Sequence, residues 1–191
     1  MNRVFMLTAL LLAVPAQAGT RKGKPRRTEA VMSRVEDVTA GRFKATPPKG
    51  WRVTKDAEGG ALQVTGPEGS GGPAPKASAV FYAKGNPHFK DAADFLARQT
   101  APTPVPIEGE KTGSVEDVKL SGRRAKRLRR DTFAVYRPPG GEPRDVALRE
   151  EVTVLEGKEG FWVLTETAPP ATWPRHAAAF AAFRDGFRAN D

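Results

Sequence analysis

The sequence predicts a single α+β domain: a central antiparallel β-sheet, a meander in its C-terminal half, and a long C-terminal helix packed on the sheet. From residue 113 to residue 167, extended stretches alternate with short connectors rich in turn-forming residues, as in an antiparallel meander. An apolar helical stripe then follows, formed by Trp173, Ala177, Phe180, Phe183 and Phe187. Such a stripe predicts packing on a sheet rather than a cofactor site.

The first 18 residues are typical of a cleaved signal peptide. Arg3 precedes an apolar run from Val4 to Val14, and the small residues Ala16 and Ala18 form the pattern that signal peptidase recognises. The apolar run is shorter than the roughly 20 residues that a membrane span needs, which disfavours an uncleaved anchor. We therefore expect export to the periplasm or the extracellular space.

The chain contains no cysteine. This excludes a bacterial lipoprotein attachment site, a disulfide, a thiol nucleophile and a cysteine-ligated metal. No later stretch is apolar enough to span a bilayer, so we expect no transmembrane segment in the mature chain. The remaining length suits one domain, which we place at residues 41–191.

The formal net charge of +9 is partly carried by an N-terminal arm, residues 19–40. The arm contains the segment RKGKPRR, and a short block of like charges with Gly and Pro predicts flexibility. From Thr28 onward 25 basic residues stand against 22 acidic ones, so the folded part is only weakly basic.

The N-terminal half is expected to combine short strands with one short helix. The spacing of valines in residues 28–39 fits a short helix, and an extended segment entering the first strand is the alternative. Asp91 is a suitable N-cap for a helix that ends near Gln99. Strands are expected near Phe43, from Trp51, and at residues 61–65 and 77–83.

The C-terminal half is expected to hold the longer strands, at residues 113–119, 123–136, 146–155 and 161–167. Their connectors are Ser121-Gly122, PPGGEP and EGKEG. For the last helix, Thr172 is expected to act as N-cap and Pro174 suits the first turn.

The segment RRAKRLRR, residues 123–130, carries six positive charges on one predicted strand. Because side chains alternate between the faces of a strand, the charges divide into two sets. One face holds Arg123, Arg127 and Arg129 with Ala125; the other holds Arg124, Lys126 and Arg130 with Leu128. Hairpin pairing would bring Glu116 and Asp117 near Arg127 and Lys126, and Glu150 or Glu151 near Arg130.

Two interpretations of this strand follow. The first is a solvated sheet face with cross-strand ion pairs, each contributing roughly 0.2–1 kcal/mol. The second is a binding face for an unknown anionic partner, formed by Arg124, Lys126 and Arg130. That partner would be an acidic protein or an anionic envelope component. Nucleic acid is not expected, because the chain is predicted to be exported and no aromatic platform interleaves the arginines.

No catalytic constellation is visible in the sequence. His88 and His176 are far apart, no serine lies in a Gly-x-Ser-x-Gly motif, and Glu150 and Glu151 alternate between faces, so they cannot act as paired acid and base. We expect no catalytic residue, no metal site and no cofactor. A hydrolase-type enzyme with a dispersed active site is the alternative, and an electrostatic binder of membrane surfaces is another.

Two segments resemble the PsbP/DcrB-like superfamily of small exported accessory proteins. The first is GRFKATPPKGWRV with the GGALQVTGP that follows, and the second is GFWVLTETAPPATWPRHAAAFAAFRDGFR. The matching residues are Phe43, Pro48, Gly50, Trp51, Trp162, Thr165, Trp173, Phe180, Phe183, Phe187 and Arg188.

The resemblance spans residues 41–188 and implies an α/β/α sandwich, a central antiparallel sheet with helices on both faces. It also implies a non-enzymatic accessory or binding protein of the cell envelope. No functional site carries over from the family, because none of the motifs quoted is a ligand-binding one.

Overall fold

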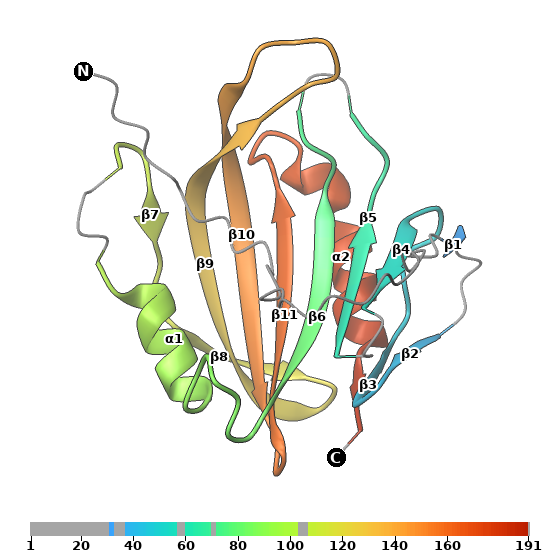
Figure 1. The fold of residues 1–191 in the computed structure, drawn as a ribbon, viewed down its shortest axis with the longest axis vertical. Coiled ribbons are helices and arrows are strands. Elements are labelled where there is room, and N and C mark those ends of the chain that lie inside the picture. Colours follow the sequence, from blue (N-terminus) through green and yellow to red (C-terminus); the bar gives the residue numbers. More distant parts are fainter. Residues whose placement is uncertain (1–30, 33–36, 57–59, 70–71, 103–106, 191) are drawn as a thin grey trace, which may run out of the picture.

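The computed structural model describes residues 31–32, 37–56, 60–69, 72–102 and 107–190 (Figure 1). The predicted signal peptide, with Ala16 and Ala18, lies outside the described residues, as does most of the predicted arm. Within residues 28–39 the described part is extended, so the predicted short helix is wrong for it and the extended alternative is confirmed. Strand pairing thus begins before Gly41, the predicted start of the domain.

The main sheet is antiparallel throughout. Its path runs through β1 (Val31–Met32), β4 (Arg52–Lys55), β5 (Ala61–Thr65), β6 (Lys76–Ala83), β11 (Gly160–Ala168), β10 (Arg144–Glu156), β9 (Arg123–Tyr136) and β7 (Lys111–Thr112). Strand β8 (Glu116–Leu120) also pairs with β9. A small second sheet holds β12 (Arg188–Ala189), β3 (Phe43–Ala45) and β2 (Val38–Ala40).

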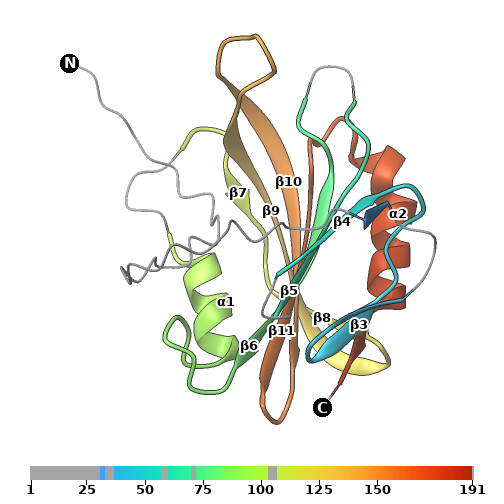
Figure 2. The same cartoon turned by 45° about the vertical axis from the view of Figure 1, so that its right-hand side comes forward.

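Helices α1 (Ala92–Thr100) and α2 (Trp173–Gly186) lie on opposite faces of the main sheet (Figure 2). Strand β11 is buried on both faces because it lies between them. Trp162 and Leu164 pack in the core that contains Phe183 of α2, while Phe161 and Val163 pack in the core that contains Phe95 of α1. The predicted α+β class, with an antiparallel meander and a C-terminal helix on the sheet, is confirmed.

The helix termini follow the predictions in part. The Asp91 carboxylate accepts a hydrogen bond from the Asp94 backbone N–H at 2.8 Å, which confirms the N-cap of α1. Thr172 occupies the N-cap position of α2, but its side chain does not cap the helix; its hydroxyl donates to the Pro169 carbonyl instead. Pro174 stands in the first turn, as predicted.

Strands β3 and β12, which lie near opposite ends of the described chain, meet beneath α2. The Phe43 and Phe187 rings lie 5.5 Å apart, and β3 pairs with β12. The Trp51 ring packs edge-on against Phe180, and Trp162 donates its indole N–H to the Arg42 carbonyl at 3.2 Å. The aromatic residues that carry the family resemblance are therefore mainly residues of the core beneath α2.

Gly160 begins β11 in a conformation that a side chain would strain. Its φ is +152°, and a Cβ there would lie 2.0 Å from the Tyr82 carbonyl oxygen. We expect Gly160→Ala to lower the free energy of unfolding by about 2–3 kcal/mol, because the β6–β11 pair must separate to admit the methyl group. Urea titration measures this. Gly69→Ala is the control, since a Cβ added at Gly69 would meet no heavy atom within 4 Å; equal effects of the two changes would contradict the argument.

Candidate functional site

The basic strand β9 distributes its charges over two faces, as its sequence alternation predicts. Ala125 packs in the core beneath α2, and we call its side of the strand the α2 face. Because side chains alternate, Arg123, Arg127 and Arg129 lie on this same face. Arg130 donates a hydrogen bond to Gln99 of α1, which marks the opposite side as the α1 face. The Ser121-Gly122 turn has positive φ at both residues, the geometry of a two-residue hairpin loop.

Cross-strand ion pairs take up most of the positive charge of β9. Glu116 stands opposite Arg127 and Asp117 opposite Lys126, and each pair lies at 2.8 Å. Glu150 stands opposite Arg130 at 2.7 Å. All three contacts confirm the register predicted from the connectors.

The predicted binding residues Arg124, Lys126 and Arg130 therefore differ in their surroundings. Lys126 pairs with Asp117, and Arg130 pairs with Glu150 and Gln99. Arg124 is exposed and forms no ion pair or hydrogen bond with any described residue. Of the three, only Arg124 keeps its guanidinium available to a partner in the described part of the chain.

Arg124 stands directly opposite Lys119 in the β8–β9 ladder. Like charges placed opposite each other destabilise a strand pair. Lys119 is also exposed and also lacks an ion pair with the described residues. The two side chains line an open hollow of about 510 Å³ with Asp117 and Val118. We call Lys119 and Arg124 the edge pair.

On the α2 face the arginines belong to a partly buried charge network. Arg129 donates through Nε to Glu151 at 2.9 Å, and Arg127 Nη1 lies 3.8 Å from the same carboxylate. Glu151 is only 5% exposed and stands directly opposite Glu166 in the β10–β11 ladder. The network thus crosses from the sheet edge to the strand beneath α2.

Glu166 is the most enclosed charged group of this network, with 1% of its surface exposed. Arg184 of α2 pairs with its Oε2, while Oε1 has no hydrogen-bond partner among the described residues. Burial raises the pKa of Glu166 to about 7; the ion pair with Arg184 opposes this rise and the charge of Glu151 adds to it. The sequence analysis did not identify that Glu151 and Glu166 stand opposite each other, although the short EGKEG connector determines that register.

The edge strand beside β9 is interrupted, where a continuous strand was predicted at residues 113–119. Thr112 stands opposite Arg130 and Glu116 opposite Arg127, so three residues of the edge strand face two of β9. This is a β-bulge, and its extra residue places both Lys111 and Glu116 on the α2 face. A second open hollow, of about 280 Å³, lies at the bulge.

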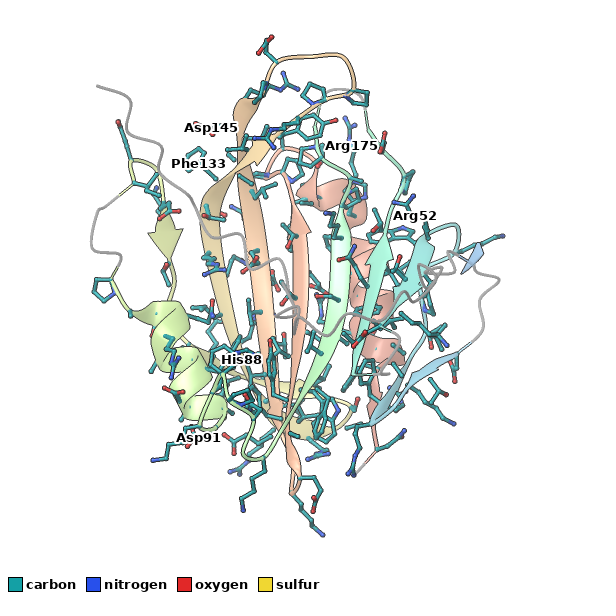
Figure 3. The ribbon with its side chains drawn as sticks, viewed as in Figure 1. Arg52, His88, Asp91, Phe133, Asp145 and Arg175 are labelled. Carbon is teal, nitrogen blue, oxygen red and sulfur yellow. The ribbon has the colours of Figure 1, made fainter. Side chains whose placement is uncertain are left out.

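The two histidines do not form a metal site with other residues that the structure describes. His88 is exposed in the turn before α1 near Asp91 (Figure 3), and His176 packs against the Trp51 ring. Burial lowers the pKa of His176. Among the described residues no group of three or more His, Asp or Glu side chains could hold a metal ion. No helix in the described part is long and apolar enough to cross a membrane.

No protein-family model matches the chain, and no curated protein matches it. Among solved structures, LpqN of Mycobacterium tuberculosis, involved in cell envelope biogenesis, is similar with a TM-score of 0.49 and 14% identity over 82% of this chain and 90% of LpqN. PA94 of Pseudomonas aeruginosa, a protein of unknown function, has a TM-score of 0.43 and 20% identity over 76% of this chain and 95% of its own.

A protein of Bacteroides thetaiotaomicron has a TM-score of 0.47 and 12% identity, with 86% of this chain and 49% of that protein covered. This chain thus spans about half the length of the Bacteroides protein. These likenesses are too distant to assign a function or a family to the chain. The resemblance to the PsbP/DcrB-like superfamily stays a prediction.

Proposed function

We propose that the chain is an exported, non-enzymatic accessory or binding protein of the cell envelope that holds an anionic partner at the basic edge of its sheet. The edge pair is the observation that carries this proposal. Lys119 and Arg124 place two like charges opposite each other and line a hollow, and neither side chain forms an ion pair or hydrogen bond with a described residue. The neighbouring Asp117 forms its ion pair with Lys126. Two opposed like charges cost stability unless an anion compensates them, which favours a binding role.

The wider edge is also basic. From Lys111 to Asp131 there are eight basic and three acidic residues: Lys111, Lys119, Arg123, Arg124, Lys126, Arg127, Arg129 and Arg130 against Glu116, Asp117 and Asp131. Carboxylates of β10 compensate only part of this excess. The predicted signal peptide supports an envelope protein, and helices on both sheet faces are what the predicted resemblance to the PsbP/DcrB-like superfamily implies.

The alternative of a hydrolase-type enzyme would use the Glu151 and Glu166 carboxylates, because one of them has a pKa near neutrality. Both carboxylates are more than nine-tenths buried, and neither lines one of the two hollows described. A substrate has no open path to them through those hollows. We therefore favour binding over acid–base catalysis.

Charge reversal at the edge pair tests the proposal. With the mature chain from Gly19, we expect Lys119→Glu combined with Arg124→Glu to weaken retention on anionic lipid vesicles or on a cell-wall fraction at least about tenfold, because two attractions become repulsions. Comparison of the two materials separates a membrane-surface partner from a cell-wall polymer.

The matched control is Arg52→Glu combined with Lys55→Glu. Both residues are exposed on β4, and Arg52 lies far across the sheet from β9 (Figure 3), so the net charge changes equally at a distant place. We expect this control to weaken retention by less than about twofold. Equal losses in the two double variants would show a response to net charge alone and would overturn the assignment to the edge pair.

A further inference from the structure

The hollow at the bulge has the features of an oxyanion site. It is lined by residues of β7, β8, β9 and the segment between β7 and β8: Lys111, Gly113, Ser114, Glu116, Arg127, Arg129, Arg130 and Asp131. Strand β7 lies along the outer edge of β9 (Figure 1). The Gly113 N–H donates to the Arg129 carbonyl at 2.9 Å, and a Cβ on Gly113 would lie 3.1 Å from that oxygen. The chain therefore approaches β9 closely there, with no side chain at Gly113 to fill the space.

Several donors at this hollow are not used by the described part of the protein. The Lys111 side chain is exposed and forms no ion pair or hydrogen bond with a described residue, although Lys111 stands opposite Asp131 in the β7–β9 ladder. The Ser114 hydroxyl likewise has no described hydrogen-bond partner. Arg129 directs Nε and Nη2 to one oxygen of Glu151, which leaves its Nη1 group without a described partner. An ammonium, a hydroxyl and part of a guanidinium are thus available together.

The carboxylates around the hollow are already neutralised. Glu116 accepts from Arg127 at 2.8 Å, and Asp131 accepts from Arg149 through both oxygens at 2.8 and 3.1 Å. The side-chain hydrogen bonds from these arginines lower the pKa of each carboxyl, so both stay ionised and paired. Since Glu151 neutralises Arg129 and Glu150 neutralises Arg130, the charge left over is that of Lys111.

The hollow is small and open. Its volume of about 280 Å³ is just below the roughly 300–1,000 Å³ that is typical of pockets for organic ligands. A single tetrahedral oxyanion fits such a space, while the rest of a larger molecule would stay outside. Guanidinium and ammonium groups together are a common setting for phosphate recognition.

We propose that the hollow between β7 and β8 binds one phosphate group, held by Lys111, Ser114 and Arg129. This rests on the proposed function, because it assigns the chemical group that an anionic partner would present. The group belongs either to a free phosphate compound or to a lipid headgroup, and both present the same tetrahedral oxyanion. The phosphate hollow and the edge pair are separate places, so each can be removed without the other.

The test titrates inorganic phosphate into the full mature chain at about pH 8, where phosphate is mostly the dianion, and follows the amide signals of Gly113 and Ser114 by NMR. We expect saturable shifts for the natural chain. Lys111→Gln combined with Ser114→Ala should weaken phosphate binding at least about fivefold, because both exposed side chains are donors in the proposed site. Arg129→Lys, which keeps a charge beside Glu151 but loses the guanidinium, should also weaken it.

The control is Lys119→Gln combined with Arg124→Gln, which should leave phosphate binding unchanged while it reduces envelope retention.

Vesicles of phosphatidylcholine with and without phosphatidic acid show whether the phosphate group belongs to a lipid headgroup or to a free compound. Binding to phosphatidic acid without free phosphate binding, lost in the Lys111 and Ser114 variant, would indicate a lipid headgroup. The proposed phosphate site is wrong if neither inorganic phosphate nor phosphatidic acid binds, or if the Lys111→Gln and Ser114→Ala variant binds both as the natural chain does. If only the edge-pair variant loses envelope retention, the proposed function still holds.

Discussion

Glu166→Gln is expected to stabilise the protein above about pH 7 and to leave its stability unchanged near pH 4.5. Glutamine resembles the protonated form of Glu166, which its buried position favours. Because burial raises the pKa of Glu166 from 4.5 to about 7, the folded state holds this proton more tightly than the unfolded state does. The stabilisation is complete below about pH 4.5 and is lost as the pH rises through about 7.

A pKa difference of this size corresponds to a change on the order of 3 kcal/mol in the free energy of unfolding. The measurement is urea unfolding of the natural chain and the Glu166→Gln variant at several pH values, with the difference between them as the readout. Carboxylates with lowered pKa, such as Asp131 and Glu116, contribute equally to both proteins and cancel. If the variant were less stable than the natural chain at high pH, Glu166 would act as an ordinary ionised partner of Arg184, and this account would be wrong.

Phe183→Ala is expected to lower the free energy of unfolding by about 3–5 kcal/mol. Phe183 is fully buried in the core that joins α2 to the sheet, so truncation leaves a cavity between the two layers. Thermal or urea unfolding measures the loss.

Phe133→Ala is the matched control for this truncation. Phe133 is only half-buried on β9 near the edge of the sheet (Figure 3), so the same change should cost less than about 1.5 kcal/mol there. If Phe183→Ala and Phe133→Ala lowered the free energy of unfolding equally, the packing of α2 on the main sheet would not be a principal source of stability.

The register of the charged strands could be predicted from the sequence because short connectors leave few alternatives. The two-residue turn at Ser121-Gly122 sets Glu116 against Arg127, and the structure shows that pair. The apolar stripe of the last helix likewise predicted the burial of Phe180 and Phe183. Ala177, also assigned to the stripe, is exposed, so the prediction was wrong for that residue.

The buried carboxylate network could not be found in the same way. Glu166 lies between Thr165 and Thr167, and three consecutive polar residues give no sign that the middle one is buried. The structure buries Glu166 because α2 covers that side of the strand, and its partner Arg184 comes from the helix. A contact between elements that are distant in the sequence has no local signal.

The bulge at residues 113–115 was missed for a different reason. A single Gly-Ser dipeptide is compatible with both a regular and a bulged strand, and only pairing with β9 distinguishes them. As a result, the binding residues predicted from the sequence were Arg124, Lys126 and Arg130, and neither Lys111 nor Ser114 was among them.

The central claim is that the basic edge of the sheet holds an anionic partner by electrostatic attraction. The most direct measurement is the affinity of the mature chain for anionic vesicles and for a cell-wall fraction, as NaCl rises from about 0.05 to about 0.5 M. We expect the affinity for at least one of these to fall at least about tenfold, with a shallower fall for the Lys119→Glu and Arg124→Glu double variant. Affinity that does not change with salt, or an identical salt dependence in that variant, would contradict the claim.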